Sequence, residues 1–314
     1  MKYLLIATVV AVLALVAFWL WTPDRSRAAL EAKYLESPDD MLDVKGVNDG
    51  PAVRLHVRDR GPKDAPAVLL LHGFGSSLQT WDAWARALAR DHRVIALDLP
   101  GSGLSPPDPS GDYRDTRTVA LLNALLDTLK VQRTSLVGNS IGGRMAWRFA
   151  AAHPDRVDKL VLVSPDGFAS PGFEYGKAPE VPAVMRLMRY VMPMVLVRQS
   201  LAPAYSDPSA LTDERLVRYD DLLRAPGGRD ALLARMAQTV LVDPAPLLRR
   251  IEAPTLLVWG NRDALIPIAN AGEYLRALPH ARLFTLDGVG HLPQEEAADR
   301  SLAEIAAFLG PSKS

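Results

Sequence analysis

The sequence predicts an α/β protein with a mostly parallel, eight-stranded sheet, helices on both faces and an inserted helical lid. One observation is a series of short uncharged apolar runs, such as Ala67–Leu71 and Val157–Val163, which are typical of strands buried on both faces. A second is that stretches with helical periodicity separate these runs, at the spacing of β-α-β units. A third is that the alternation stops at about residue 169 and resumes after residue 250.

The composition limits the function classes. The chain has 314 residues, enough for one large α/β domain with an insertion, and its 36 Lys and Arg balance its 36 Asp and Glu, so no net charge indicates a nucleic acid partner. It has no cysteine, which excludes disulfides, thiolate metal sites and a cysteine nucleophile. The six histidines form no H-x-x-x-H pair, so no metal is predicted. No cofactor is predicted either.

The N-terminal residues predict a membrane anchor. Leu4–Trp21 contains no charged residue, and Trp19 and Trp21 suit a membrane–water interface. Residues 1–24 are therefore predicted to span a membrane once, and the flanking charges do not determine which side carries the rest of the chain. The alternative is a cleaved signal peptide followed by secretion. Residues 25–40 are predicted to form a juxtamembrane linker with a short amphipathic helix.

Two segments of the chain, 41–168 and 251–314, are predicted to form the α/β core. The strands expected in them are Met41–Val44, Ala52–Val57, Ala67–Leu71, Val94–Leu97, Ser135–Val137, Val157–Val163, Pro254–Gly260 and Ala281–Leu286. The helices expected between and after them include Thr116–Leu129, Ile268–Leu278 and Leu302–Leu309.

Residues 169–250 are predicted to form a helical lid. They contain many prolines and no clear strand, and Val184, Met188, Val191 and Val195 fall on one face of a helix. Such a stripe is also what an ordinary core helix shows. Because the segment interrupts a regular alternation, we interpret it as an insertion over the site, with Met188 and Met192 contacting the substrate.

A strand-turn-helix segment supplies the candidate nucleophile. Ser135–Val137 is followed by Gly138-Asn139-Ser140-Ile141-Gly142-Gly143, and a helix begins at Ile141. A strand that turns directly into a helix strains the central residue, so small residues must flank it. This setting predicts that Ser140 is a nucleophile, whereas the bare G-x-S-x-G pattern also occurs in ordinary loops.

A serine nucleophile needs a base and an orienting carboxylate. His291 follows the last predicted strand and Gly290, which makes it the best candidate base, and Leu292 after it is predicted to contact the substrate. Asp263 ends the preceding strand and is the favoured acid. Asp166, at the end of the sixth strand, is the alternative acid.

The oxyanion of an acyl-transfer intermediate needs two preorganised donors, and each contributes about 3 kcal/mol in measured cases. The predicted donors are the backbone N–H groups of Ile141, directly after the nucleophile, and of Phe74, in the loop after the third strand.

From Met41 to the C-terminus the sequence resembles the α/β-hydrolase superfamily. The motifs that carry the resemblance are His72-Gly73-Phe74-Gly75, Asp98-x-Pro100-Gly101-x-Gly103-x-Ser105, Gly138-Asn139-Ser140-Ile141-Gly142-Gly143, Gly260-Asn261-x-Asp263 and Gly290-His291. Within the superfamily it is similar to the serine esterase and lipase branch, including membrane-anchored monoacylglycerol-lipase-like hydrolases. The elbow also resembles that of the meta-cleavage carbon–carbon hydrolases, which typically have Trp where this chain has Leu292.

We therefore expect a membrane-anchored serine hydrolase that cleaves carboxylic esters, with a lipid-like or acyl ester as its small-molecule partner. The alternatives are a carbon–carbon bond hydrolase and a catalytically silent scaffold of the same fold. The oligomeric state stays open.

Overall fold

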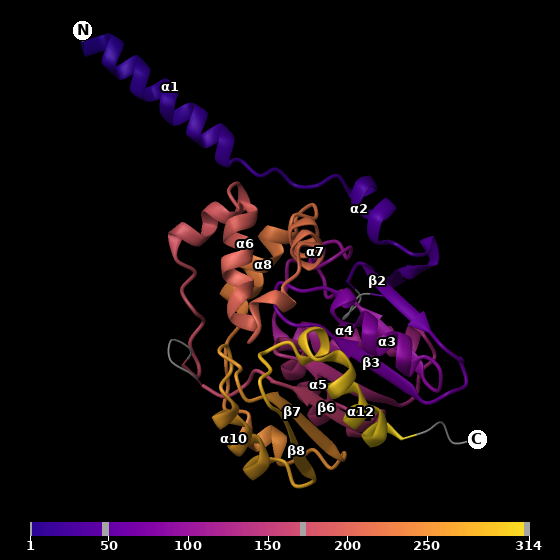
Figure 1. Ribbon diagram of the computed structural model, residues 1–314. Helices are drawn as coiled ribbons and strands as arrows, with labels where there is room; N and C mark the ends of the chain where they lie inside the picture. The colour runs from indigo at the N-terminus through magenta and orange to yellow at the C-terminus, as the bar shows by residue number, and fades with distance from the viewer. Residues whose placement is uncertain (1, 46–49, 170–173, 311–314) are drawn as a thin grey trace.

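The computed structural model describes residues 2–45, 50–169 and 174–310 (Figure 1). Its eight strands form one sheet in the order β1-β2-β4-β3-β5-β6-β7-β8. They are β1 (Met41–Val44), β2 (Val53–Arg60), β3 (Ala67–Leu71), β4 (Arg93–Leu97), β5 (Thr134–Asn139), β6 (Val157–Val163), β7 (Thr255–Gly260) and β8 (Ala281–Leu286).

The sheet is mostly parallel. β2 pairs antiparallel with β1 and with β4, and the neighbours from β4 to β8 pair parallel. The register places Leu71 of β3 opposite Gly138 of β5, so these strands end at the same edge of the sheet. The predicted fold class is confirmed, and β6 has the predicted bounds.

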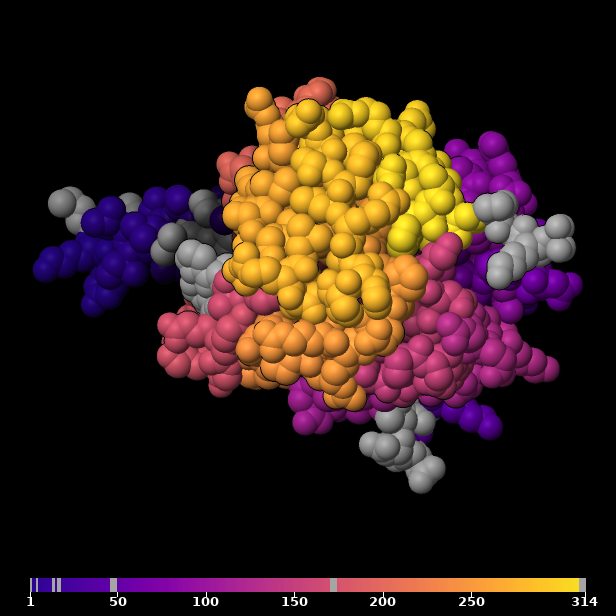
Figure 2. Space-filling view, turned by 90° about the horizontal axis from the view of Figure 1, so that it is seen from below, coloured from indigo at the N-terminus to yellow at the C-terminus, as the bar shows by residue number. Residues whose placement is uncertain are grey.

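Helices cover both faces of the sheet. On one face α3 (Asp82–Leu88) and α12 (Ala298–Leu309) pack over a core that includes Trp81, Trp84 and Ile305. The opposite core includes Trp147 and Tyr274, and the helices around it are α4 (Asp115–Thr128), α5 (Ile141–Ala152), α9 (Ala245–Leu248) and α10 (Ala271–Ala277). Figure 2 views the molecule from below, where the chain after residue 251, in orange and yellow, forms a continuous surface.

A helical cap lies between β6 and β7 in the sequence and beside one end of the sheet in space (Figure 1). Its helices are α6 (Met194–Leu201), α7 (Asp213–Leu223) and α8 (Gly228–Gln238). A separate small core, with Met192, Val197 and Leu292 among its members, joins the cap to the loop after β8. The bounds 169–250 for a lid remain a prediction, and residues 170–173 of it lie outside the described residues.

The cap differs from its prediction in one respect. The apolar stripe from Val184 to Val195 predicted one helix, but the structure has a 3-10 helix over Ala183–Arg189 and then α6 from Met194. The reason is Pro193, which cannot donate a backbone hydrogen bond and begins a new helix as its N-cap.

The predicted membrane anchor is wrong. α1 (Lys2–Leu20) projects away from the rest of the chain (Figure 1), but no helix in the described residues is long and apolar enough to cross a membrane. The membrane localisation predicted from this segment is wrong for the same reason. The predicted linker helix does form, as α2 (Arg27–Tyr34).

Trp81→Ala should lower the free energy of unfolding by about 3–5 kcal/mol, because the fully buried indole would leave a cavity. Leu275→Ala is the control, since Leu275 is 39% exposed, and its effect should stay within about 0.5 kcal/mol. Urea denaturation of both variants measures the difference, and equal losses would contradict the packing described here.

Candidate active site

The predicted site residues come together at one edge of the sheet. Ser140 follows β5, Asp263 follows β7, and His291 follows β8, while the loop with Phe74 follows β3. These strands are parallel members of one sheet, so their carboxyl ends meet at the edge that the cap covers. In α/β sheets this edge is where ligands bind.

Ser140 has the strained backbone that the sequence predicted. Its φ is +55° and its ψ is −120°, which a side-chain-bearing residue rarely adopts. The flanking glycines explain how the turn fits. A Cβ built on Gly138 would lie 2.3 Å from the carbonyl oxygen of Gly142, and one built on Gly142 would lie 2.2 Å from that of Leu71. Only glycine allows α5 to begin this close to β3 and β5.

His291 and Asp263 form a buried hydrogen-bonded pair. The Nδ1 atom of His291 lies 2.8 Å from Oδ2 of Asp263, and the side chains are 5% and 0% exposed. The other carboxylate oxygen of Asp263 accepts hydrogen bonds from the N–H groups of Leu265 and Ile266, each at 2.9 Å. This arrangement holds the imidazole with Nδ1 protonated, which leaves Nε2 available as a base.

The alternative acid, Asp166, has a different partner. Its Oδ2 lies 2.6 Å from Nη1 of Arg144, a buried residue of α5. Its backbone N–H donates to the carbonyl of Ser140 at 3.1 Å, so the loop after β6 supports the turn at Ser140. The carboxylate that contacts His291 is therefore that of Asp263.

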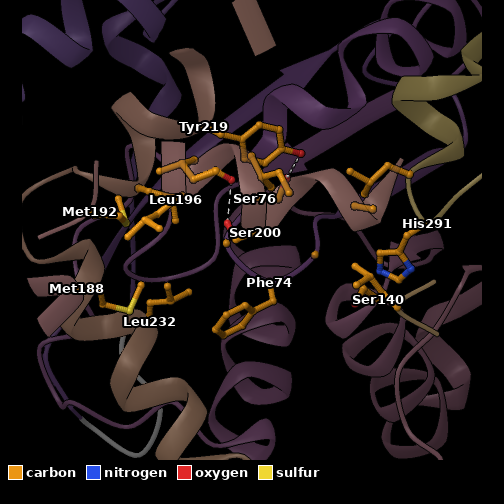
Figure 3. A pocket seen from close by; sticks show the side chains of 18 of the residues that line it. Phe74, Ser76, Ser140, Met188, Met192, Leu196, Ser200, Tyr219, Leu232 and His291 are labelled. Atoms are coloured by element: carbon orange, nitrogen blue, oxygen red, sulfur yellow. Dashed lines mark hydrogen bonds between the residues drawn. The ribbon is translucent and has the colours of Figure 1, made fainter. Parts of the chain in front are cut away.

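Ser140 and His291 line the same pocket, where Figure 3 shows both side chains. Within the part of the chain that the structure describes, they form no hydrogen bond with one another. Such contacts are often long in unliganded hydrolases and shorten when substrate binds. The catalytic roles of Ser140, Asp263 and His291 remain a prediction.

The loop after β3 lies against the nucleophile. A Cβ built on Gly73 would lie 3.4 Å from Cβ of Ser140, so the backbone that leads to Phe74 passes directly beside it. As the first residue of α5, Ile141 has an N–H without an intrahelical acceptor. Both predicted oxyanion donors are therefore at the site, although their role remains a prediction.

His72 shapes this loop. Its Nδ1 lies 2.8 Å from the carbonyl oxygen of Gly73, and its Nε2 accepts a hydrogen bond from the N–H of Leu99 at 3.0 Å. Burial lowers the pKa of His72, which keeps the ring neutral and allows one nitrogen to donate while the other accepts.

The site opens into an apolar pocket of about 410 Å³. The three predicted substrate-binding residues, Met188, Met192 and Leu292, all belong to its lining, although contact with a substrate remains a prediction. In Figure 3, Ser140 and His291 lie at one end of the view and Met188 and Leu232 at the other. Phe74, which is 42% exposed, lies between them.

The sequence did not indicate a buried polar cluster that joins the cap to the catalytic loop. Glu295, in α11 (Pro293–Glu296), accepts hydrogen bonds from Tyr205 at 2.7 Å, from Tyr219 at 3.0 Å and from Arg218 at 2.6 Å. The only sequence signal was an acidic residue close after His291, and its partners come from two distant segments.

A profile of the α/β-hydrolase fold matches residues 66–298, which is most of the chain and includes every candidate catalytic residue. The chain belongs to the α/β-hydrolase fold family.

Curated relatives of this α/β hydrolase are named as hydrolases of 2-hydroxy-6-oxo acids. A 2-hydroxy-6-oxononadienedioate/2-hydroxy-6-oxononatrienedioate hydrolase of Cupriavidus pinatubonensis is 31% identical over 274 residues, covering 84% of this chain and 93% of the relative. A 2-hydroxy-6-oxo-6-phenylhexa-2,4-dienoate hydrolase of Burkholderia cepacia is 30% identical, covering 82% and 91%.

A solved structure matches more of the chain. It is described as a membrane phospholipase A and bacterial virulence factor, is 27% identical, and aligns with a TM-score of 0.72 over 98% of this α/β hydrolase and 98% of its own chain.

Gly142→Ala should abolish most activity and destabilise the fold by about 1–3 kcal/mol or more, because the new methyl group would overlap the carbonyl of Leu71. Gly272→Ala is a matched control in another helix, where a Cβ meets nothing closer than 3.6 Å. It should raise stability by up to about 1 kcal/mol. Thermal unfolding of the two proteins provides the comparison, and a well-folded Gly142→Ala protein would contradict the close approach.

Asp263→Asn should lower kcat by about 10⁴-fold if Asp263 is the acid, as loss of the orienting carboxylate does in Ser-His-Asp enzymes. Asp166→Asn should retain most activity, because Asp166 contacts Arg144 rather than His291. Steady-state rates on one substrate decide between the two acids, and the opposite ranking would identify Asp166 as the functional partner.

Proposed function

We propose that this α/β hydrolase is a serine hydrolase of uncharged carboxylic esters with an apolar acyl group. The observation that carries the proposal is the chemistry of the pocket. It has no Lys, Arg, Asp or Glu among the described residues that line it, and most of its side chains are aliphatic or Met. An apolar chain gains free energy on entering such a pocket, whereas an unpaired carboxylate loses it.

The proposed reaction follows the geometry of the site. Ser140 Oγ attacks the ester carbonyl while His291 Nε2 accepts its proton, and Asp263 stabilises the resulting imidazolium. The N–H groups of Phe74 and Ile141 stabilise the oxyanion. His291 then gives the proton to the departing alcohol. A water molecule then attacks the carbonyl carbon of the acyl-enzyme while the same ring accepts its proton. The tetrahedral intermediate that forms collapses, His291 returns the proton to Oγ of Ser140, and the acid is released.

The second candidate function is cleavage of a carbon–carbon bond, as in the curated relatives at 30–31% identity. The substrates in their names are dienoates and dienedioates, which carry one or two carboxylates. Recognition of such anions requires cationic or N–H donors close to the pocket. The relative named as a phospholipase, with its nearly complete coverage, supports the ester hypothesis instead.

The full chain should hydrolyse an uncharged acyl ester with a kcat/KM at least about 100-fold above that for 2-hydroxy-6-oxo-6-phenylhexa-2,4-dienoate. This ratio corresponds to ~3 kcal/mol for burying a carboxylate without a partner. Both rates are measured by product release on one preparation. A fluorophosphonate probe should label the protein stoichiometrically and should not label Ser140→Ala. Faster turnover of the dienoate would favour the carbon–carbon hydrolase, and absence of labelling would favour the silent scaffold.

A further inference from the structure

The hydroxyl groups in the middle of the pocket have a fixed hydrogen-bond direction, and the buried Glu295 sets it. A carboxylate that Arg218 contacts at 2.6 Å accepts hydrogen bonds and does not donate them. Both Tyr205 and Tyr219 must therefore donate their O–H groups to it, at 2.7 and 3.0 Å. Burial, and then the charge of Glu295, raise the pKa of Tyr219 to about 12, so the proton that it donates stays in place.

The hydrogen bond from Tyr219 to Glu295 also fixes which hydroxyl group donates in the contact between Tyr219 and Ser76. The two hydroxyl oxygens lie 3.4 Å apart, and both residues line the pocket (Figure 3). Because the Tyr219 proton points to Glu295, the Tyr219 oxygen accepts and Ser76 donates. The Ser76 side chain, in a residue only 8% exposed, then faces the pocket with lone pairs and no proton.

Ser200 also presents a hydrogen-bond acceptor to the pocket. Its hydroxyl donates to the carbonyl oxygen of Val197 at 2.8 Å, which leaves its lone pairs for the pocket. Asn139 adds no donor, since its Nδ2 donates to the carbonyl oxygens of Val163 at 3.2 Å and His291 at 3.1 Å. Apart from Ser140 and His291, the polar side chains in the described lining therefore present acceptors only.

We propose that Ser76 and Ser200 form a specificity subsite that accepts a hydrogen bond from a hydroxyl group of the substrate. This inference rests on the proposed ester hydrolysis and narrows its substrate class to esters that carry a free hydroxyl. The hydroxyl can belong to the acyl chain, as in a hydroxyacyl ester, or to the alcohol, as in a monoester of a polyol. In both cases the substrate places one hydroxyl group, as a hydrogen-bond donor, in an otherwise apolar pocket.

The test uses the full chain and four esters with the same acyl length: an unsubstituted ester, its hydroxyacyl and methoxyacyl derivatives, and the corresponding monoacylglycerol. The methoxy group occupies the position of the hydroxyl but can only accept. The wild-type kcat/KM should favour the hydroxyl-bearing esters over the methoxy ester by about tenfold, the effect of one net hydrogen bond. A preference for the hydroxyacyl ester alone assigns the donor to the acyl chain, and a preference for the monoacylglycerol alone assigns it to the alcohol.

Tyr219→Phe should reverse the preference, because Ser76 would lose its acceptor and could donate to the methoxy oxygen. Tyr205→Phe is the matched control. It removes a similar hydrogen bond to Glu295, but Tyr205 is not itself among the described lining residues and its hydroxyl bonds Glu295 rather than Ser76, so the ratio should not change. Ser76→Ala, which leaves the contact between Tyr219 and Glu295 in place, should lower the hydroxy-to-methoxy ratio, with Ser200 as the remaining acceptor.

Two results would overturn the inference while leaving ester hydrolysis intact: wild-type rates for the hydroxyacyl ester and the monoacylglycerol that both equal the rate for the methoxyacyl ester, or equal changes of the ratio in Tyr219→Phe and Tyr205→Phe. Loss of turnover for all four esters, the unsubstituted one included, would overturn the proposed function and this inference together. Turnover of the unsubstituted ester therefore distinguishes failure of this inference from failure of the proposed function.

Discussion

The close approach of α5 to the end of β3 is the steric constraint on which the site depends. Gly142 lies so near the carbonyl of Leu71 that no larger residue fits. This approach holds the start of α5, at Ile141, beside the loop after β3 that carries Phe74. One contact between backbones therefore positions both the candidate nucleophile and its candidate oxyanion donors, before any side chain interaction is formed.

The sequence predicted those parts of the structure in which the residue pattern of a single segment indicates how that segment is buried. β6 is a continuous apolar run because both of its faces are buried, and its predicted and observed bounds agree. Ser140, Asp263 and His291 each follow a strand, so parallel pairing was enough to predict that they meet. In the cap the apolar stripe was a weaker signal than Pro193, which caps the start of α6 after the 3-10 helix has ended at Arg189.

What the sequence could not predict depends on contacts between distant segments. The direction of the hydrogen bonds at Glu295 is set by three residues from the cap, more than 70 positions away in the chain. No local pattern encodes such a contact, because Tyr205, Arg218 and Tyr219 are ordinary residues in their own segments. α1 shows the opposite error, since an uncharged run predicted a membrane span from composition alone, whereas no helix in the described residues is long and apolar enough to cross a membrane.

The cap contacts the loop that carries His291 in two ways, by hydrogen bonds in one part and by apolar packing in another. The backbone N–H of His291 donates to the carbonyl of Ala204 at 2.8 Å, and Tyr205 donates to Glu295, so this part supports the candidate base. The Met188 segment packs against the small core that includes Leu292, and on its other side the buried Arg229 donates to the carbonyls of Met188 at 3.1 Å and Thr22 at 2.7 Å. Flexible Met side chains in this apolar contact can adapt to the acyl chain of the proposed substrate without a change in the hydrogen bonds at Ala204 and Glu295. This division explains how one pocket can combine an adaptable apolar wall with a rigid catalytic end.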